Sequence, residues 1–358
     1  MFKKISLLMG SVALSIIAAK AQPRPISDAQ ALEAGHRIES ATNSGNAYQI
    51  GHFLVPDSLL ENIRVKSKAL KDPAFLTGFK ETFVPTLQRY GEQVMAGIKG
   101  GNYRLLREYD DHGVKHLVFR LFGLGGLNYH DFILIRLGDT VRASDLYPFT
   151  SEEWLSTSMA NLTDMMSKSF AAGENINVIQ KLEEQASKKD YAGIKESYEK
   201  LDSDYKNDRM IQYLYVRACH HIDTKLYEDV LERYARNFPD AGSGYLLMLD
   251  LYYLQKEPTK GLAAIDKLDK LVGGDPFLDF FRGSFYTIAG DSVASLSCYE
   301  KVFKYDPGIS VNSLRLARRY AVANKVDQAK AVIAGYKQTI AYHEGDLDDL
   351  YSTYPALK

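Results

Sequence analysis

The sequence predicts a two-domain protein in which an α+β domain is followed by an all-α domain. Strand-like alternation of apolar and polar residues is confined to residues 103–147, where short runs are separated by glycine-rich turns. From Glu174 onward the strand pattern is absent, and amphipathic segments of about 12 to 16 residues follow one another. The expected divisions are a signal peptide (1–21), the α+β domain (22–172), the helical domain (173–345) and a C-terminal tail (346–358).

The composition is that of a globular protein and excludes several functional classes. The chain has 358 residues, of which 46% are hydrophobic and 25% are charged, so it is long enough to bury two cores. Its 44 basic residues are balanced by 45 acidic ones, so we expect no nucleic-acid partner. The two cysteines, Cys219 and Cys298, are too few for a disulfide framework, and we expect both to be buried apolar side chains.

The first 21 residues have the pattern of a secretory signal peptide. Lys3 and Lys4 precede an apolar run over 5–19, and small residues then stand at the two positions that a signal peptidase recognises. The run is shorter than the roughly 20 residues that span a bilayer, so cleavage between Ala21 and Gln22 is favoured over an uncleaved anchor helix. We therefore expect a secreted or periplasmic protein with no stable membrane insertion after cleavage.

The α+β domain is expected to begin with helices and to continue with a sheet. Helices are predicted over 28–42, 57–70 and 73–98, and Pro85 is expected to split the third. Four strands follow over 103–109, 114–122, 127–137 and 140–147. Their short connections predict an antiparallel meander with the helices packed on one face. A further amphipathic helix over 151–167, which contains Trp154, leads to the helical domain.

This order of elements resembles the cone-shaped domains of the nuclear-transport-factor-2-like (NTF2-like) and cystatin-like group. The resemblance rests on helices followed by a strongly curved four-stranded meander, without a signature motif. It departs from the family pattern because the strands of that group are normally interrupted by a helix, which this sequence lacks. A generic α+β sandwich is the alternative.

The helical domain contains an internal repeat of about 34 residues. Small or apolar residues recur at Ile194, Val230, Ala264, Ser295 and Ala329. Four residues after each of these, a larger side chain recurs at Tyr198, Tyr234, Leu268, Tyr299 and Ile333. The repeat predicts successive helix pairs, and an irregular helical bundle is the alternative.

The segment over 277–307 carries the best copy of the repeat and resembles a tetratricopeptide repeat (TPR). The matching positions are Gly283, Tyr286, Gly290, Asp291, Ser295, Tyr299, Val302 and Pro307. The small residues allow two helices to approach closely, Gly290 is expected in a left-handed turn, and Asp291 is expected to cap the next helix. The resemblance implies a right-handed solenoid of about five helix pairs over 174–340 that binds a protein or peptide. Ile194 and Val230 depart from it because they are large at a small position.

The inner surface of such a solenoid is lined by the first helix of each pair. Counting along the repeat gives an apolar, aromatic groove formed by Tyr215, Leu249, Tyr253, Phe277, Phe280, Leu314 and Arg318. The first interpretation is that a partner peptide occupies this groove. The alternatives are that the N-terminal domain itself fills the groove, or that the counting is displaced by one helix face.

A second candidate site lies on the last predicted hairpin. If Gly138 and Asp139 form a two-residue turn, His130 lies opposite Tyr147 and Phe132 opposite Asp145, all on one face of the sheet. His130, Asp145 and Tyr147 would then form an acid–base or small-molecule pocket. A hydrogen-bonded network at the edge of a core and an exposed polar face are the alternatives.

Two functions are compatible with these patterns. The first is an exported, non-enzymatic interaction protein or scaffold that binds a peptide or protein partner in the helical groove and needs neither cofactor nor metal. The alternative is a small-molecule-binding protein or hydrolase that uses the pocket of the N-terminal domain. Cys219, His220 and His221 are adjacent and point apart on a helix, so no metal site is expected there.

Overall fold

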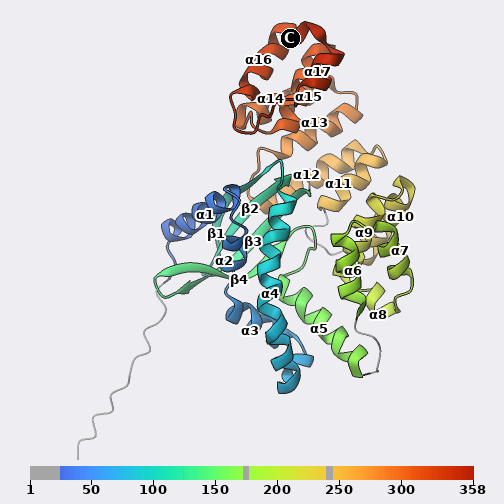
Figure 1. Cartoon of the computed structure of the whole chain (residues 1–358). Helices are drawn as coiled ribbons and strands as arrows, with labels where there is room; N and C mark the ends of the chain where they lie inside the picture. Colours follow the sequence, from blue (N-terminus) through green and yellow to red (C-terminus); the bar gives the residue numbers. More distant parts are fainter. Residues whose placement is uncertain (1–24, 124, 172–176, 239–244) are drawn as a thin grey trace, which may run out of the picture.

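The computed structural model describes residues 25–123, 125–171, 177–238 and 245–358, and Figure 1 shows their arrangement. A four-stranded antiparallel sheet within residues 102–148 follows the N-terminal helices, and a helical half follows the sheet. The α+β arrangement followed by helices is therefore confirmed. The predicted signal peptide lies outside the described residues.

The N-terminal helices begin where the sequence places their caps. Helix α1 (Asp28–Asn43) starts at a capping box made by Ser27 and Gln30. Helix α4 (Pro73–Gly97) starts at Asp72, whose carboxylate accepts hydrogen bonds from two backbone N–H groups of the first turn. Between them lie α2 (Ala47–Phe53), α3 (Pro56–Lys66) and the short 3₁₀ helix η1 (Ala69–Lys71).

Two expectations about these helices were wrong. Helix α4 runs continuously through Pro85, because the buried side chains of Phe83 and Leu87 hold its apolar face against the core on either side of the missing hydrogen bond. Helix α2 was not predicted, because its seven residues show no clear period. The burial of Ile50 and Phe53 in the core holds it in place.

The sheet is a simple meander with the strand order β1-β2-β3-β4. Its strands are β1 (Asn102–Asp111), β2 (Val114–Gly123), β3 (Gly126–Leu137) and β4 (Thr140–Pro148). One face packs on the N-terminal helices through Phe119, Phe132 and Leu146. The opposite face, through Val118 and Tyr129, packs on the helical half. The sheet is therefore covered on both faces, as Figure 1 shows.

The helical half consists of α5 (Leu155–Ala171) and successive helix hairpins. The hairpins are α6 (Asn177–Ser187) with α7 (Tyr191–Glu199), α9 (Arg209–His220) with α10 (Thr224–Asn237), α11 (Tyr245–Leu254) with α12 (Pro258–Val272), α13 (Leu278–Ile288) with α14 (Ser292–Tyr305), and α15 (Ser310–Val322) with α16 (Val326–Lys337). The short α8 (Ser203–Lys206) lies between the first two hairpins. The C-terminal α17 (Asp348–Thr353) and η2 (Pro355–Leu357) bury Leu350 and Leu357 against the last hairpin.

The hairpin of α13 and α14 has the local geometry that the sequence predicts. A Cβ atom added at Gly283 would lie 2.8 Å from the ring of Tyr299, so only glycine allows this close approach. Gly290 has φ +79°, and the carboxylate of Asp291 accepts a hydrogen bond from the N–H of Ala294 at 2.9 Å. The ten repeat positions that the sequence marks, Ile194, Tyr198, Val230, Tyr234, Ala264, Leu268, Ser295, Tyr299, Ala329 and Ile333, are all buried.

Candidate functional site

The predicted pocket on the last hairpin is not formed. The expected pairing of β3 with β4 holds from Leu137 and Thr140 as far as Leu134 and Ala143, where a bulge shifts the register by one residue. Asp131 instead of His130 therefore lies opposite Tyr147. Because side chains alternate along a strand, this shift separates the predicted residues between the two faces of the sheet.

His130 lies in the core beneath the N-terminal helices. Its Nε2 is 3.1 Å from the hydroxyl of Tyr90, and its Nδ1 is 3.2 Å from the hydroxyl of Tyr103. Burial lowers the pKa of His130 to about 3, so the imidazole is neutral at physiological pH. Phe132 packs edge-on against the same imidazole at 5.9 Å between ring centroids. The arrangement is the hydrogen-bonded core network that was the alternative interpretation.

Asp145 holds the start of α5. Its Oδ1 accepts a hydrogen bond from the backbone N–H of Ser156 at 3.1 Å, and the hydroxyl of Ser156 donates to its Oδ2. Tyr147 packs instead against Phe149 and Trp154 on the other side of the sheet. Each of the three polar candidates thus has a separate structural environment.

Most of the predicted groove residues are buried. The ring of Phe277 packs against Phe122 of β2 at 4.5 Å, and Leu249 lies in one apolar cluster with Val118. At these positions the N-terminal domain itself fills the groove, which was one of the alternatives. Tyr215 stacks on Tyr198 at 3.9 Å within the first hairpins.

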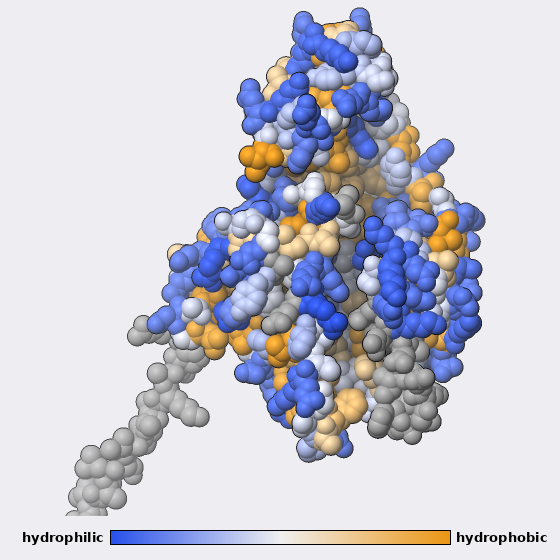
Figure 2. Space-filling model, viewed as in Figure 1, coloured by the Kyte–Doolittle hydropathy of each residue, from blue (hydrophilic) through white to orange (hydrophobic). Residues whose placement is uncertain are grey.

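The remaining four groove residues share no single environment. Phe280 is 9% exposed and Leu314 is half-buried, whereas Tyr253 is 51% exposed. Arg318 is exposed and forms an ion pair with Asp349. Figure 2 shows mainly hydrophilic residues on the face it presents, with hydrophobic ones in small separate areas. A continuous apolar groove was therefore the wrong expectation.

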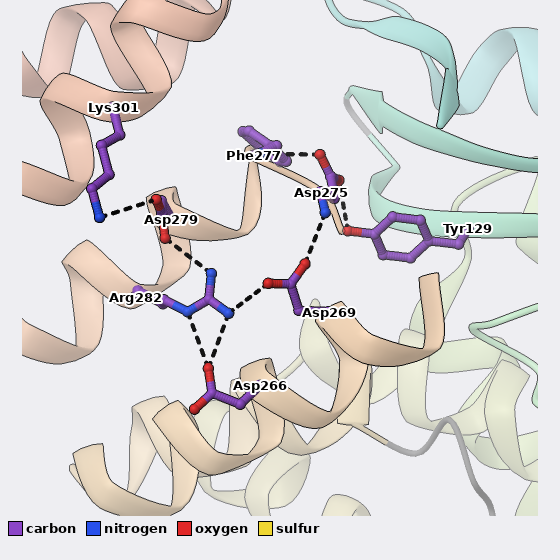
Figure 3. Close-up of polar contacts among 8 residues, drawn as sticks. All are labelled: Tyr129, Asp266, Asp269, Asp275, Phe277, Asp279, Arg282 and Lys301. Carbon is purple, nitrogen blue, oxygen red and sulfur yellow. Dashed lines mark hydrogen bonds and ion pairs between the residues drawn. The ribbon is translucent and has the colours of Figure 1, made fainter. Parts of the chain in front are cut away.

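The contact between the two halves is polar at its centre. Asp275, in the connection between α12 and α13, accepts a hydrogen bond from Nη1 of Arg120 at 2.7 Å and another from the hydroxyl of Tyr129 at 2.9 Å. Figure 3 shows Tyr129 reaching Asp275 from the sheet. In the same view, Arg282 forms ion pairs with three aspartates of α12 and α13, Asp266, Asp269 and Asp279. The contacts of Asp275 hold the sheet against the helices, and the ion pairs of Arg282 join α12 to α13.

An open pocket of about 330 Å³ lies on the helical half and is the candidate functional site. Residues of α11, α13, α14 and α15 line it: Tyr253, Ser284, Thr287, Ile288, Tyr299, Arg315, Arg318, Arg319 and Val322. It contains Tyr253 and Arg318 of the predicted groove. Arg315 and Arg319 were not predicted as site residues, although the spacing of 315, 318 and 319 places all three arginines on one helix face.

Two arginines of the pocket are held by neutral partners. Nη1 of Arg315 donates to Oγ of Ser284 at 2.8 Å, and its guanidinium lies 4.7 Å from the centre of the Phe280 ring. Nη2 of Arg319 donates to Oγ1 of Thr287 at 2.6 Å. Within the part of the chain that the structure describes, neither arginine is paired with a carboxylate. Their positive charge is therefore available to a ligand.

Tyr299 also lines this pocket, and its hydroxyl lies 3.3 Å from Oγ of Ser284. Burial raises the pKa of the Tyr299 phenol, but hydrogen bonds from Ser284 and Arg315 outweigh burial and hold that pKa below its ordinary value. Apolar surface is provided in the same lining by Tyr253 and by Val322, which is 70% exposed. The pocket thus combines cationic donors with an apolar rim.

Comparison of the chain with models of protein families, with curated proteins and with solved structures found no match. Over the described ranges, no group of three His, Cys, Asp or Glu side chains is placed to hold a metal ion. None of the helices described has both the length and the apolar character needed to span a lipid bilayer.

Proposed function

We propose that the helical half is a tetratricopeptide-type solenoid and that it serves as a non-enzymatic scaffold for a protein or peptide partner. Support comes from the five successive hairpins, from the buried repeat positions, and from the geometry of Gly283, Gly290 and Asp291. An array of short repeats offers a surface assembled from several hairpins, which suits an extended segment of a partner. The start of the sequence supports export to the periplasm or outside the cell.

The observation that carries the proposal is the open pocket across three hairpins with two arginines that lack a carboxylate partner among the described residues. A guanidinium group forms strong, oriented hydrogen bonds with a carboxylate. We propose that the bound segment places an acidic side chain or its terminal carboxylate between Arg315 and Arg319. Its neighbouring apolar residues would then pack on Tyr253 and Val322.

An array of ten-residue peptides tests this function with the purified protein. Each peptide carries one acidic residue flanked by apolar residues, and the matched peptide carries the corresponding amide. We expect the acidic peptides to be retained preferentially, and Arg315→Glu to reduce their binding at least tenfold. Arg236→Glu, at an exposed position of α10, is the control for a general change of charge and should bind normally.

Two results would overturn the proposal. One is equal retention of the acidic and amide peptides, or retention of neither. The other is an equal loss of binding in Arg315→Glu and Arg236→Glu, which would indicate attraction to the overall charge of the protein. Far-UV circular dichroism of both variants checks that the helices are retained.

A further inference from the structure

A second open pocket, of about 200 Å³, lies in the N-terminal half among α1, α2 and the start of β4. Its lining is formed by Arg37, Ile38, Gln49, His52, Phe53, Thr140 and Arg142. The two arginines come from elements about a hundred residues apart in sequence and meet at the same opening. This pocket is separate from the helical-half pocket described above.

Both guanidinium groups are anchored by backbone carbonyls. Nη2 of Arg37 donates to the carbonyl of Val141 at 3.2 Å. Nη2 of Arg142 donates to the carbonyls of His52 and Leu54, at the C-terminal end of α2. These bonds orient the guanidinium groups without neutralising their charge, and no ion pair with a carboxylate is formed by either arginine in the described ranges.

One donor of Arg142 is buried and unused. Nε of Arg142 is inaccessible to solvent and has no hydrogen-bond acceptor among the described residues. A buried donor without an acceptor is costly, so the protein chain leaves the Arg142 guanidinium incompletely satisfied. The pocket also contains the amide of Gln49 and the imidazole of His52, which stacks on Tyr48 at 5.0 Å.

The pKa shifts of Arg142 and His52 agree with an excess of positive charge in this pocket. Burial lowers the pKa of the Arg142 guanidinium; Tyr48 partly offsets this effect, and the charge of Arg37 adds to the lowering. Burial, and then the charge of Arg142, lower the pKa of His52 below its ordinary value, so this imidazole is neutral at pH 7 and offers one N–H donor. The two arginines therefore provide the fixed charge, and the neutral side chains provide further donors.

We propose that this pocket binds a dianionic phosphate group, held between Arg37 and Arg142 with Gln49 and His52 as additional donors. Two guanidinium groups without counter-charges match the two negative charges of a dianionic phosphate. The volume exceeds that of a phosphate ion, and Ile38 and Phe53 line part of it, so a small organic phosphate fits the same chemistry. This inference is independent of the proposed function of the helical half.

Isothermal titration calorimetry of the purified protein tests the site at constant ionic strength. Inorganic phosphate and glycerol 3-phosphate are the two probes, and acetate is the monoanionic control. We expect saturable 1:1 binding of at least one phosphate probe and at least tenfold weaker binding of acetate. Tighter binding of glycerol 3-phosphate would identify an organic phosphate as the ligand, and equal or tighter binding of inorganic phosphate would identify the free ion.

Substitutions test whether phosphate binds in this pocket. Arg37→Gln removes one charge at an exposed position and should weaken phosphate binding at least tenfold, whereas Arg37→Lys should retain part of it. Arg89→Gln, an exposed arginine of α4, is the matched control, and Arg315→Glu separates this site from the helical pocket. Absence of phosphate binding in the unmodified protein would overturn the proposal. So would equal affinity in Arg37→Gln and Arg89→Gln, or acetate binding as tight as phosphate binding.

Discussion

Nη1 of Arg120 in β2 lies 2.7 Å from Oδ1 of Asp275 in the helical half, and both side chains are almost fully buried, with exposures of 1% and 0%. The guanidinium also lies 5.0 Å from the centre of the Phe277 ring. Tyr129 donates to the second carboxylate oxygen of Asp275. The pair therefore joins the two halves through charges that have no access to water.

Removal of one member of this pair should be strongly destabilising. Asp275→Ala leaves the charge of Arg120 buried without a partner, so we expect a loss of about 3–5 kcal/mol in the free energy of unfolding. Urea unfolding followed by circular dichroism measures the change. Asp266→Ala, in which a mostly exposed aspartate is removed, is the control and should cost less than about 1 kcal/mol. A loss below 1 kcal/mol in Asp275→Ala would contradict a stabilising role for the buried pair.

Stability should fall on acidification because of His130. The imidazole has a pKa of about 3 in the folded protein and its ordinary value of 6.5 in the unfolded chain. Its contribution is fully present above pH 6.5 and is lost progressively as the pH falls towards 3, since only the unfolded chain gains the proton. Between pH 7 and 4.5 this amounts to about 2–3 kcal/mol.

The variant His130→Gln keeps hydrogen-bonding groups near Tyr90 and Tyr103 but does not titrate. We expect its free energy of unfolding to depend less steeply on pH between 7 and 4.5 than that of the unmodified protein. The exposed His112→Gln controls for loss of a histidine. Parallel pH profiles for the unmodified protein and His130→Gln would show that the imidazole is not held neutral.

Glu152 should have the opposite effect on the pH dependence of stability. Its side chain is buried, both carboxylate oxygens lack a hydrogen-bond partner among the described residues, and Arg209 is 3.8 Å away. Burial raises the pKa of Glu152 to about 7 from its ordinary 4.5. The folded state therefore has its full stability below pH 4.5 and loses some as the pH rises through 7.

Glu152→Gln removes this ionisation. We expect the variant to be more stable than the unmodified protein at pH 8, by about 3 kcal/mol, and to differ little from it at pH 4.5. Thermal unfolding at the two pH values measures the difference. Glu81→Gln, at an exposed position of α4, should change stability by less than about 0.5 kcal/mol. An equal effect of Glu152→Gln at both pH values would contradict the assignment.

The close approach of α13 and α14 requires glycine at position 283. In Gly283→Ala the new Cβ would meet the buried ring of Tyr299 at 2.8 Å, so we expect a loss of about 1–3 kcal/mol despite the better helix propensity of alanine. Gly78→Ala in α4 is the matched control, because a Cβ there meets nothing within 4 Å and should stabilise by up to about 1 kcal/mol. Urea unfolding compares the two variants. Stabilisation of both would show that the helices do not approach this closely.

Local chemistry was sufficient for the four strands and for most of the helices, but not for the short helix α2 or for the continuity of α4 through Pro85. The cap at Asp72, the glycine turns between the strands and the spacing of the repeat positions each act over a few residues, and the structure confirms them. The candidate sites depended on contacts that no local pattern encodes. One bulge in β4 was enough to separate His130 from Tyr147, because a shift of one residue reverses the face of a strand side chain.

The sequence by itself determined the α+β half, the helical half and the positions at which helices approach one another, since these follow from periodicity, turn residues and side-chain size. Only the tertiary structure decided which surfaces remain open. The second face of the sheet covers Phe277 and Leu249 of the predicted groove, while Arg315 and Arg319 remain accessible as part of the pocket. The physical reason is that burial of apolar surface is favourable whichever element covers it. Here the covering element is the sheet, which lies more than a hundred residues away in the sequence.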